Sequence, residues 1–223
     1  MTPCPPVRIL ALDASGAQAS VGIIEGDQLL AYRQSQAGAG LADRLTLMLA
    51  DTLSDAAQGP HSIEAIAVII GPGSFTGIRA SLALAQGFGQ TAQIPVHGVR
   101  LTEAFHQDLP ALTRPLWVAA TARRGQVFLE RDGVAASFAD DSVPHPSVPI
   151  ALAGERAIAV AAYLAAHDAN VLLTPARIPS LCAIAKALRH RLATGGPIIA
   201  PLPLYVDPPE AKLPAAGLRP APV

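Results

Sequence analysis

A glycine-rich turn, residues 71–79 with the sequence Gly-Pro-Gly-Ser-Phe-Thr-Gly-Ile-Arg, joins a short apolar run to a long alanine-rich stretch. The apolar run, Ala65 to Ile70, has the length and branched side chains of a buried strand, and the stretch after the turn is predicted to be helical to about Ala92. Because a helix N-terminus leaves backbone N–H groups without internal partners, we expect Ser74 or Thr76 to cap it. The turn therefore predicts a buried strand that runs directly into a helix, in a geometry that can also hold an anion.

Three known nucleotide-binding or catalytic motifs do not fit this turn. A P-loop needs a lysine next to a serine or threonine, and no lysine occurs in the first 100 residues. A dinucleotide-binding turn needs an acidic residue about twenty positions further on, and here the first acidic residue after Gly77 is Glu103. A nucleophile elbow needs glycines two residues either side of the serine, where Ser74 has Pro72 and Thr76.

The helix after the turn is rich in residues that have small side chains or none: Ala80, Ser81, Ala83, Ala85, Gly87 and Gly89. Each of the two glycines lowers intrinsic helix stability by roughly 1 kcal/mol relative to alanine. A helix that keeps both is expected to recover this loss through close tertiary or subunit contact. We favour packing over ligand binding for this element, with ligand binding as the alternative.

The nonapeptide, placed after a strand and before a small-residue helix, resembles the signature of the TsaB family. The resemblance extends to Ile9-Leu10-Ala11-Leu12-Asp13 near the start, and to Pro203-Leu204-Tyr205-Val206 and Ala211-Lys212 near the end. It implies the partner subunit of bacterial tRNA threonylcarbamoyladenosine synthesis. It also implies an α/β, two-lobed fold like that of actin, the sugar kinases and the heat-shock ATPases, which is a duplicated ribonuclease H-like fold.

The periodicity of the chain agrees with two α/β halves that each open with a β-hairpin. Strands are expected at 7–13, 19–24, 28–34, 65–70, 95–99, 116–122, 126–130, 150–153 and 171–173, and helices at 41–56, 77–92, 102–108, 155–166 and 179–192. The repeat is not traceable by spacing beyond the second hairpin. We expect an N-terminal lobe at 1–106 that carries the partner interface, and a C-terminal lobe at 107–199. The resemblance alone implies that residues 200–223 return to the first lobe.

Composition limits the functions open to the chain. Its 223 residues, 51% of them hydrophobic, are enough for one large domain or two small lobes. The charged fraction of 15% fits a surface partly covered by a partner, and equally an alanine-rich genome composition. A net charge of −1 argues against binding nucleic acid through the field of the whole protein, so contact with tRNA is expected to be indirect.

The two predicted hairpins do not provide a pair of carboxylates at equivalent positions. Superimposing the hairpins places Thr121 over Asp13, and threonine does not ionise usefully. TsaB relatives commonly show Asp-Ala-Arg followed by a glutamate here, whereas this chain has Thr121-Ala122-Arg123 and then Gln126. We therefore expect Asp13 to cap a turn, and we expect no catalytic residues.

No metal, cofactor or membrane segment is expected. The catalytic paralogue of the TsaB family carries an HxxxH metal pair, and the six histidines of this chain are scattered. Cys4 and Cys182 are too few for a disulfide framework or a zinc site. The first residues lack the apolar stretch of a secretion signal, and the longest apolar helical run is half the length that a membrane helix needs. A cytoplasmic protein is expected.

The function that the resemblance implies is a non-catalytic scaffold for the catalytic, TsaD-like paralogue, together with a TsaE-like ATPase, in modification of adenosine next to the anticodon. A homodimer is expected when the chain is alone. The partner interface is expected on the helices that begin near Leu41 and Gly77, at Leu45, Met48, Phe75, Arg79, Leu82, Ala83 and Gln86. For Leu45, Leu49 and Leu82, ordinary packing within the lobe is an equally favoured alternative. The alternative is an ATP-dependent phosphotransferase of the same fold, which would bind and hydrolyse nucleotide in isolation.

Overall fold

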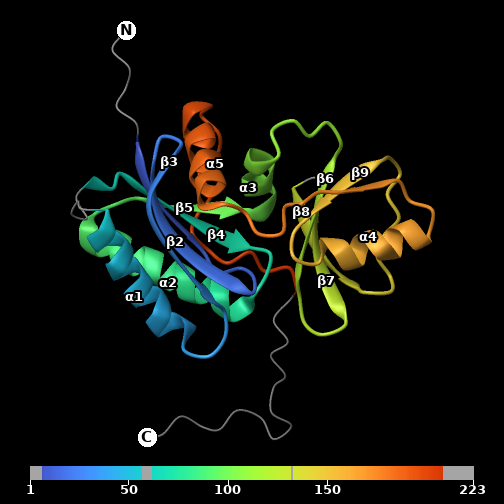
Figure 1. Cartoon of the computed structure of the whole chain (residues 1–223), viewed down its shortest axis with the longest axis horizontal. Coiled ribbons are helices and arrows are strands. Elements are labelled where there is room, and N and C mark those ends of the chain that lie inside the picture. The colour runs from blue at the N-terminus through green and yellow to red at the C-terminus, as the bar shows by residue number, and fades with distance from the viewer. Residues whose placement is uncertain (1–6, 57–61, 132, 208–223) are drawn as a thin grey trace, which may run out of the picture.

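Two mixed β-sheets lie side by side in the computed structural model, which describes residues 7–56, 62–131 and 133–207 (Figure 1). Within these ranges each sheet has five strands, and helices pack against the sheets. This is the two-lobed α/β arrangement expected from the sequence. Cys4, Ala211, Lys212 and the rest of the tail after residue 207 lie outside the described residues.

The first sheet is built from the chain before residue 101. Its strands are β1 (Arg8–Asp13), β2 (Gln18–Glu25), β3 (Gln28–Gln36), β4 (Ala65–Gly71) and β5 (Val96–Arg100), in the order β3-β2-β1-β4-β5. The first three strands are antiparallel, and β4 and β5 run parallel to β1. Every residue of β4 is buried, because its two faces belong to two different hydrophobic cores, and this explains its uninterrupted apolar sequence.

The second sheet repeats this plan. Its strands are β6 (Leu116–Thr121), β7 (Gln126–Arg131), β8 (Val134–Ala139), β9 (Ile150–Ala153) and β10 (Val171–Leu173), in the order β10-β9-β6-β7-β8. Sequence reasoning missed β8, whose short, alanine-rich stretch has little strand character of its own. It forms an edge strand because its backbone pairs with β7 along its whole length. The duplication therefore runs through all five strands of each sheet.

The helices are α1 (Leu41–Asp55), α2 (Phe75–Ala92), α3 (Leu101–Asp108), α4 (Ala157–Ala166) and α5 (Leu181–Ala193). Helices α1 and α2 pack on the outer face of the first sheet, and α4 packs on the outer face of the second. Helices α3 and α5 pack against each other between the sheets, where they share one core with the inner strand faces. We use "first lobe" for the first sheet with α1 and α2, and "second lobe" for the second sheet with α4.

Helix α5 departs from the expected division of the chain. Residues 107–199 were expected to form the C-terminal lobe, whereas α5 packs mainly on β1, β2 and α3 (Figure 1). The reason is its apolar face, on which Leu181, Ile184 and Leu188 are buried against the inner face of the first sheet, which includes Ile9. Local periodicity predicts a helix with an apolar face and does not determine which sheet that face covers.

A polar network ties the lobes together beside this central core. The Glu130 carboxylate on β7 is fully buried, and it accepts a hydrogen bond of 3.2 Å from the backbone N–H of Thr102 on α3. Burial raises its pKa, and the Arg100 guanidinium 3.5 Å away acts in the opposite direction. Arg191 of α5 donates to the carboxylate of Glu103, the next residue of α3. The charged groups at this junction thus have partners.

The chain returns to the first lobe after α5 through an extended stretch, residues 197–207, which we call the C-terminal segment. The Ile199 carbonyl accepts from the N–H of Gly98 on β5 at 2.9 Å, and the Leu204 N–H donates to the carbonyl of Ile70 on β4, also at 2.9 Å.

Among the described residues, none of the helices combines the length and apolar character needed to cross a bilayer.

Candidate docking site on helix α2

Helix α2 begins as the sequence predicts. Ser74 is its N-cap, and the Ser74 hydroxyl accepts a hydrogen bond from the Gly77 N–H at 3.2 Å. The backbone N–H of Ser74 donates to the carbonyl of Ser15, in the turn between β1 and β2, at 2.7 Å. A Cβ atom at Gly77 would overlap the carbonyl oxygen of Ala14 in the same turn. This glycine is thus needed to bring the start of α2 against the β1–β2 turn.

The two glycines in the second half of α2 have different surroundings. A Cβ atom at Gly89 would lie 2.8 Å from the carbonyl oxygen of Ile94, closer than folded proteins tolerate, so the protein's own packing accounts for this glycine. A Cβ atom at Gly87 would meet nothing within 4 Å. Gly87 is exposed, one helical turn after the exposed Ala83. The cost of a mid-helix glycine at position 87 is therefore not recovered inside the described fold.

The residues predicted for a partner interface fall into two groups. Leu45, Met48 and Leu82 are at most 7% exposed and lie in the core between α1, α2 and the first sheet, so they are not available to a partner. These three residues are buried because they lie on the apolar faces of α1 and α2. The apolar face of an amphipathic helix is the face that packs on its own sheet. The other four predicted residues are exposed or half-buried: Phe75, Arg79, Ala83 and Gln86.

We use "α2 outer face" for the exposed residues Ala83, Gln86, Gly87 and Gln90. The C-terminal segment borders this face, since the Gln86 side-chain amide donates to the carbonyl of Pro201 at 2.6 Å. Leu202, in the same segment, is 63% exposed. The outer face thus presents small and uncharged side chains beside an exposed leucine. Sequence reasoning missed Leu202, because nothing in its local pattern places it next to α2.

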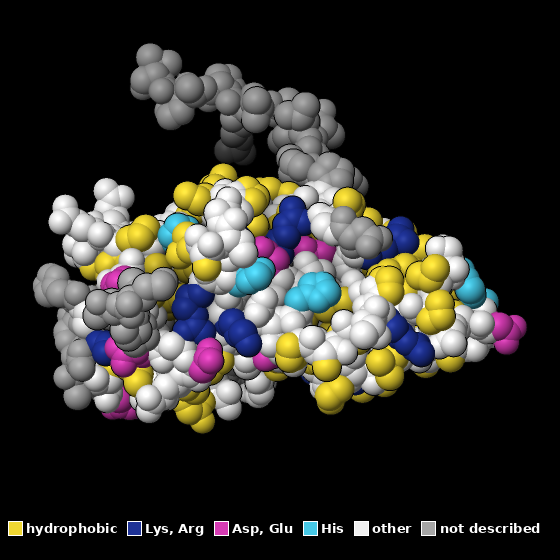
Figure 2. All heavy atoms as spheres, turned by 90° about the horizontal axis from the view of Figure 1, so that it is seen from above, with side chains coloured by type: hydrophobic (Ala, Val, Ile, Leu, Met, Phe, Trp, Pro, Cys, Tyr) yellow, Lys and Arg dark blue, Asp and Glu magenta, His cyan; other side chains and the backbone are white. Residues whose placement is uncertain are grey.

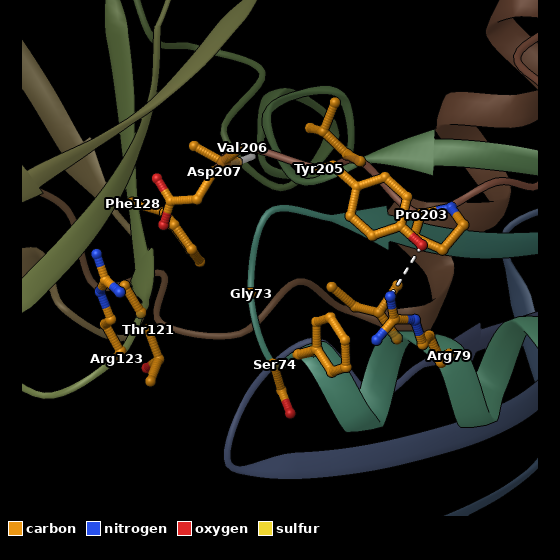
Figure 3. A pocket seen from close by; sticks show the side chains of 14 residues that line it. Gly73, Ser74, Arg79, Thr121, Arg123, Phe128, Pro203, Tyr205, Val206 and Asp207 are labelled. Atoms are coloured by element: carbon orange, nitrogen blue, oxygen red, sulfur yellow. Dashed lines mark hydrogen bonds between the residues drawn. The ribbon is translucent and has the colours of Figure 1, made fainter. Parts of the chain in front are cut away.

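Arg79 lies nearer to the start of α2 and is held between two rings. Its guanidinium carbon is 3.2 Å from the centre of the Phe75 ring and 5.4 Å from that of Tyr205, and the guanidinium donates to the Tyr205 hydroxyl at 3.0 Å (Figure 3). Tyr205 is 126 residues away in the sequence. The tertiary contact with Tyr205 therefore fixes the direction in which the Arg79 side chain points.

The cleft between the two hairpins holds the two carboxylates of Asp13 and Glu155. Asp13 is 2% exposed, and its Oδ1 accepts from the Ser15 N–H at 2.8 Å, as expected of a turn cap. Burial raises the pKa of Asp13 from 3.8 to about 6, and the charge of Glu155 adds to this rise. Glu155 itself accepts from the Ala17 N–H at 2.6 Å and from the Thr121 hydroxyl at 2.8 Å.

The structure corrects the superposition of Thr121 on Asp13. Along β1, Ile9 and Ala11 face the central core, so Asp13 lies on that inner face. Along β6, Val118 and Ala120 face the central core, which puts Thr121 on the opposite face. The second-lobe carboxylate in this cleft is Glu155, from the loop before α4. Sequence reasoning missed Glu155 because it compared the two hairpins only, and the loop before α4 lies outside both of them.

The remaining charged and metal-binding side chains are dispersed. In the ranges that the structure describes, no three histidine, cysteine or acidic side chains are close enough to hold a metal ion together. On the face of the molecule seen in Figure 2, lysine and arginine side chains lie in separate groups, with acidic side chains beside some of them. This face therefore presents a mixed charge distribution rather than one continuous basic surface.

Known proteins resemble this chain in both sequence and fold. The family model described as TsaD, tRNA N6-adenosine threonylcarbamoyltransferase, matches residues 35–164. An uncharacterized protein of Mycobacterium tuberculosis is 32% identical over 213 residues, which cover 92% of this chain and 93% of that protein. The tRNA threonylcarbamoyladenosine biosynthesis protein TsaB of Escherichia coli is 32% identical over 130 residues, 55% of this chain and 53% of that protein.

Solved structures share the fold of this chain. YeaZ from Pseudomonas aeruginosa superimposes with a TM-score of 0.72 at 23% identity, over 89% of this chain and 99% of that chain. The ethanolamine utilization protein EutJ from Carboxydothermus hydrogenoformans has a TM-score of 0.50 at 11% identity, over 84% of this chain and 91% of that chain, and likewise shares the fold alone. The fold is thus the two-lobed actin-like ATPase fold, and the sequence matches show that the chain belongs to the TsaB family, within the group that the threonylcarbamoyltransferase model describes.

Proposed function

We propose that this protein acts in tRNA threonylcarbamoyladenosine biosynthesis as a non-catalytic scaffold that binds a threonylcarbamoyltransferase paralogue through the α2 outer face. Membership of the TsaB family supports the pathway, because the named relatives in Escherichia coli and Bacillus subtilis are threonylcarbamoyladenosine biosynthesis proteins. In the same proposal a TsaE-like ATPase joins the complex, the chain pairs with itself when the paralogue is absent, and tRNA is contacted through the paralogue.

The observation that carries the docking proposal is Gly87. A glycine inside a helix lowers stability by roughly 1 kcal/mol relative to alanine, and no atom of the described fold needs the space that its missing side chain leaves. Together with Ala83 one turn earlier, Gly87 allows the backbone of another helix to approach α2 closely. Leu202 lies beside this face and offers apolar area to the same partner.

The hydrogen bonds of the two carboxylates in the cleft between the hairpins support a non-catalytic role. Asp13 accepts the Ser15 N–H, and both oxygens of Glu155 accept hydrogen bonds from groups of this chain. Carboxylates committed to a turn and to a contact between the lobes suit a structural role. A phosphotransferase would need them to handle a metal ion or a substrate hydroxyl.

Replacing Ala83 with glutamate is expected to weaken binding of the threonylcarbamoyltransferase paralogue roughly ten-fold or more. A bulky charge on a closely packed face costs about 1–3 kcal/mol in a fitted contact. Isothermal titration calorimetry between the two purified proteins measures the effect. The matched control is Ala162→Glu, an exposed alanine on α4 of the second lobe, which should leave the affinity unchanged.

A folded Ala83→Glu protein that binds the paralogue as tightly as the wild type would contradict docking through the α2 outer face. Circular dichroism and thermal melting establish that the variant is folded, and because Ala83 is already exposed, the substitution should change its melting temperature little. Sedimentation velocity of the chain alone would show whether self-association uses the same face.

A further inference from the structure

A cavity of about 600 Å³ opens between the lobes next to the start of α2 (Figure 3). Four stretches of the chain form its walls: the start of α2 with the residues just before it, the end of β6 with its following turn, Phe128 on β7, and the C-terminal segment. Cavities of this size are typical of small-molecule sites in proteins. The pocket lies at the N-terminal end of α2, whereas the α2 outer face lies further along the helix.

The walls of this cavity are largely apolar and include three aromatic rings. Phe75 comes from α2, Phe128 from β7 and Tyr205 from the C-terminal segment. Phe75 and Tyr205 are 65% and 60% exposed, which is high for aromatic rings in a folded protein. Three rings from separate elements around one cavity provide faces and edges against which a flat ring can stack.

Cationic groups line the same cavity. Arg79 donates a hydrogen bond to the Tyr205 hydroxyl, and in the described part of the chain it forms no ion pair with a carboxylate. A guanidinium has five N–H donors in a rigid plane, and here the Phe75 and Tyr205 rings hold that plane in place. Arg123 lines the opposite side, and Asp207 is the acidic residue in the lining.

We propose that this pocket binds a small molecule that combines an aromatic ring with a carboxylate or phosphate group. The ring stacks among Phe75, Phe128 and Tyr205, and the anionic group pairs with Arg79, with Arg123 adding a second positive charge. Because the aromatic sandwich already fixes the Arg79 side chain, binding loses little side-chain entropy. This site is separate from docking through the α2 outer face, and either can exist without the other.

Phenyl phosphate tests the proposal, because it is the smallest probe with both features. It is titrated into the full-length protein by isothermal titration calorimetry, with benzyl alcohol as the neutral aromatic probe and inorganic phosphate as the anion without a ring. Saturable binding at one site per chain is expected for phenyl phosphate, with weaker binding of the other two. Sodium benzoate in place of phenyl phosphate distinguishes a carboxylate from a phosphate site.

Arg79→Gln is expected to weaken binding of phenyl phosphate about ten-fold, since a charge-assisted hydrogen bond is lost. Arg123→Gln is expected to weaken it about three-fold, and because Arg123 is exposed, this variant keeps the test valid if Arg79→Gln does not fold. The matched control is Arg124→Gln, which neutralises an exposed neighbour that does not line the cavity. No saturable binding, or equal affinity in the wild type and a folded Arg79→Gln or Arg123→Gln protein, overturns the proposal.

Discussion

Replacing Gly77 with alanine is expected to lower the free energy of unfolding by more than about 3 kcal/mol. The added Cβ atom would overlap the carbonyl oxygen of Ala14, a backbone atom in the turn between β1 and β2. A backbone atom has no rotamer into which it can move, so either α2 or the turn must shift. Either movement disturbs the N-cap bond from the Gly77 N–H to Ser74 and the bond from the Ser74 N–H to Ser15.

The matched control for this change is Gly87→Ala on the same helix. Its new methyl group meets open space, so the substitution is expected to raise the free energy of unfolding by about 0.5–1 kcal/mol through helix propensity alone. Urea unfolding followed by circular dichroism measures both variants. A Gly77→Ala protein as stable as the wild type would show that the start of α2 is not tightly seated. The docking proposal adds that Gly87→Ala, although more stable, binds the paralogue less tightly.

Replacing Asp13 with asparagine is expected to raise stability at pH 7 by up to about 3 kcal/mol. The pKa of Asp13 is about 6 in the folded protein against an ordinary value of 3.8, and one pKa unit corresponds to about 1.4 kcal/mol. The buried carboxylate therefore destabilises the fold once it is ionised. Asparagine keeps the shape of the side chain and can still accept the hydrogen bond from the Ser15 N–H.

The pH dependence of this effect has a definite sign. Because the folded protein holds the Asp13 proton more tightly than the unfolded chain, the stability that this proton provides is complete below about pH 4 and is lost as the pH rises through about 6. The stability difference between Asp13→Asn and the wild type should therefore be small at pH 4, grow from pH 4 to 6, and level off above that.

Urea unfolding at a series of pH values measures this difference, and the exposed Asp141→Asn serves as its control, with an expected change below about 0.5 kcal/mol throughout. A difference between Asp13→Asn and the wild type that stays constant from pH 4 to 7 would mean that Asp13 does not titrate in this range. A variant less stable than the wild type at pH 7 would mean that the ionised carboxylate contributes a favourable contact in the fold.

The sequence by itself determined those features that depend on neighbouring residues. The strand β4, the N-cap at Ser74 and helix α2 follow from apolar periodicity, a glycine turn and a capping hydroxyl, all within about thirty residues. The hairpin at the start of each half was predictable for the same reason, since turn residues and alternation act over short distances. The nonapeptide then pointed to the family, and with it to the two-lobed fold.

Tertiary structure alone decided which neighbours these local features contact. Gly77 and Gly89 pack against other backbone and Gly87 faces open space, although all three are glycines of one helix. The surroundings of each glycine depend on which other segments of the chain pack against it, and sequence periodicity does not show this. In the same way, α5 lies on the first sheet, the pairing of β8 with β7 makes it a strand, and Tyr205 meets Arg79 across 126 residues. Contacts between distant residues follow from the packing of whole elements, and a local pattern of side chains carries no information about them.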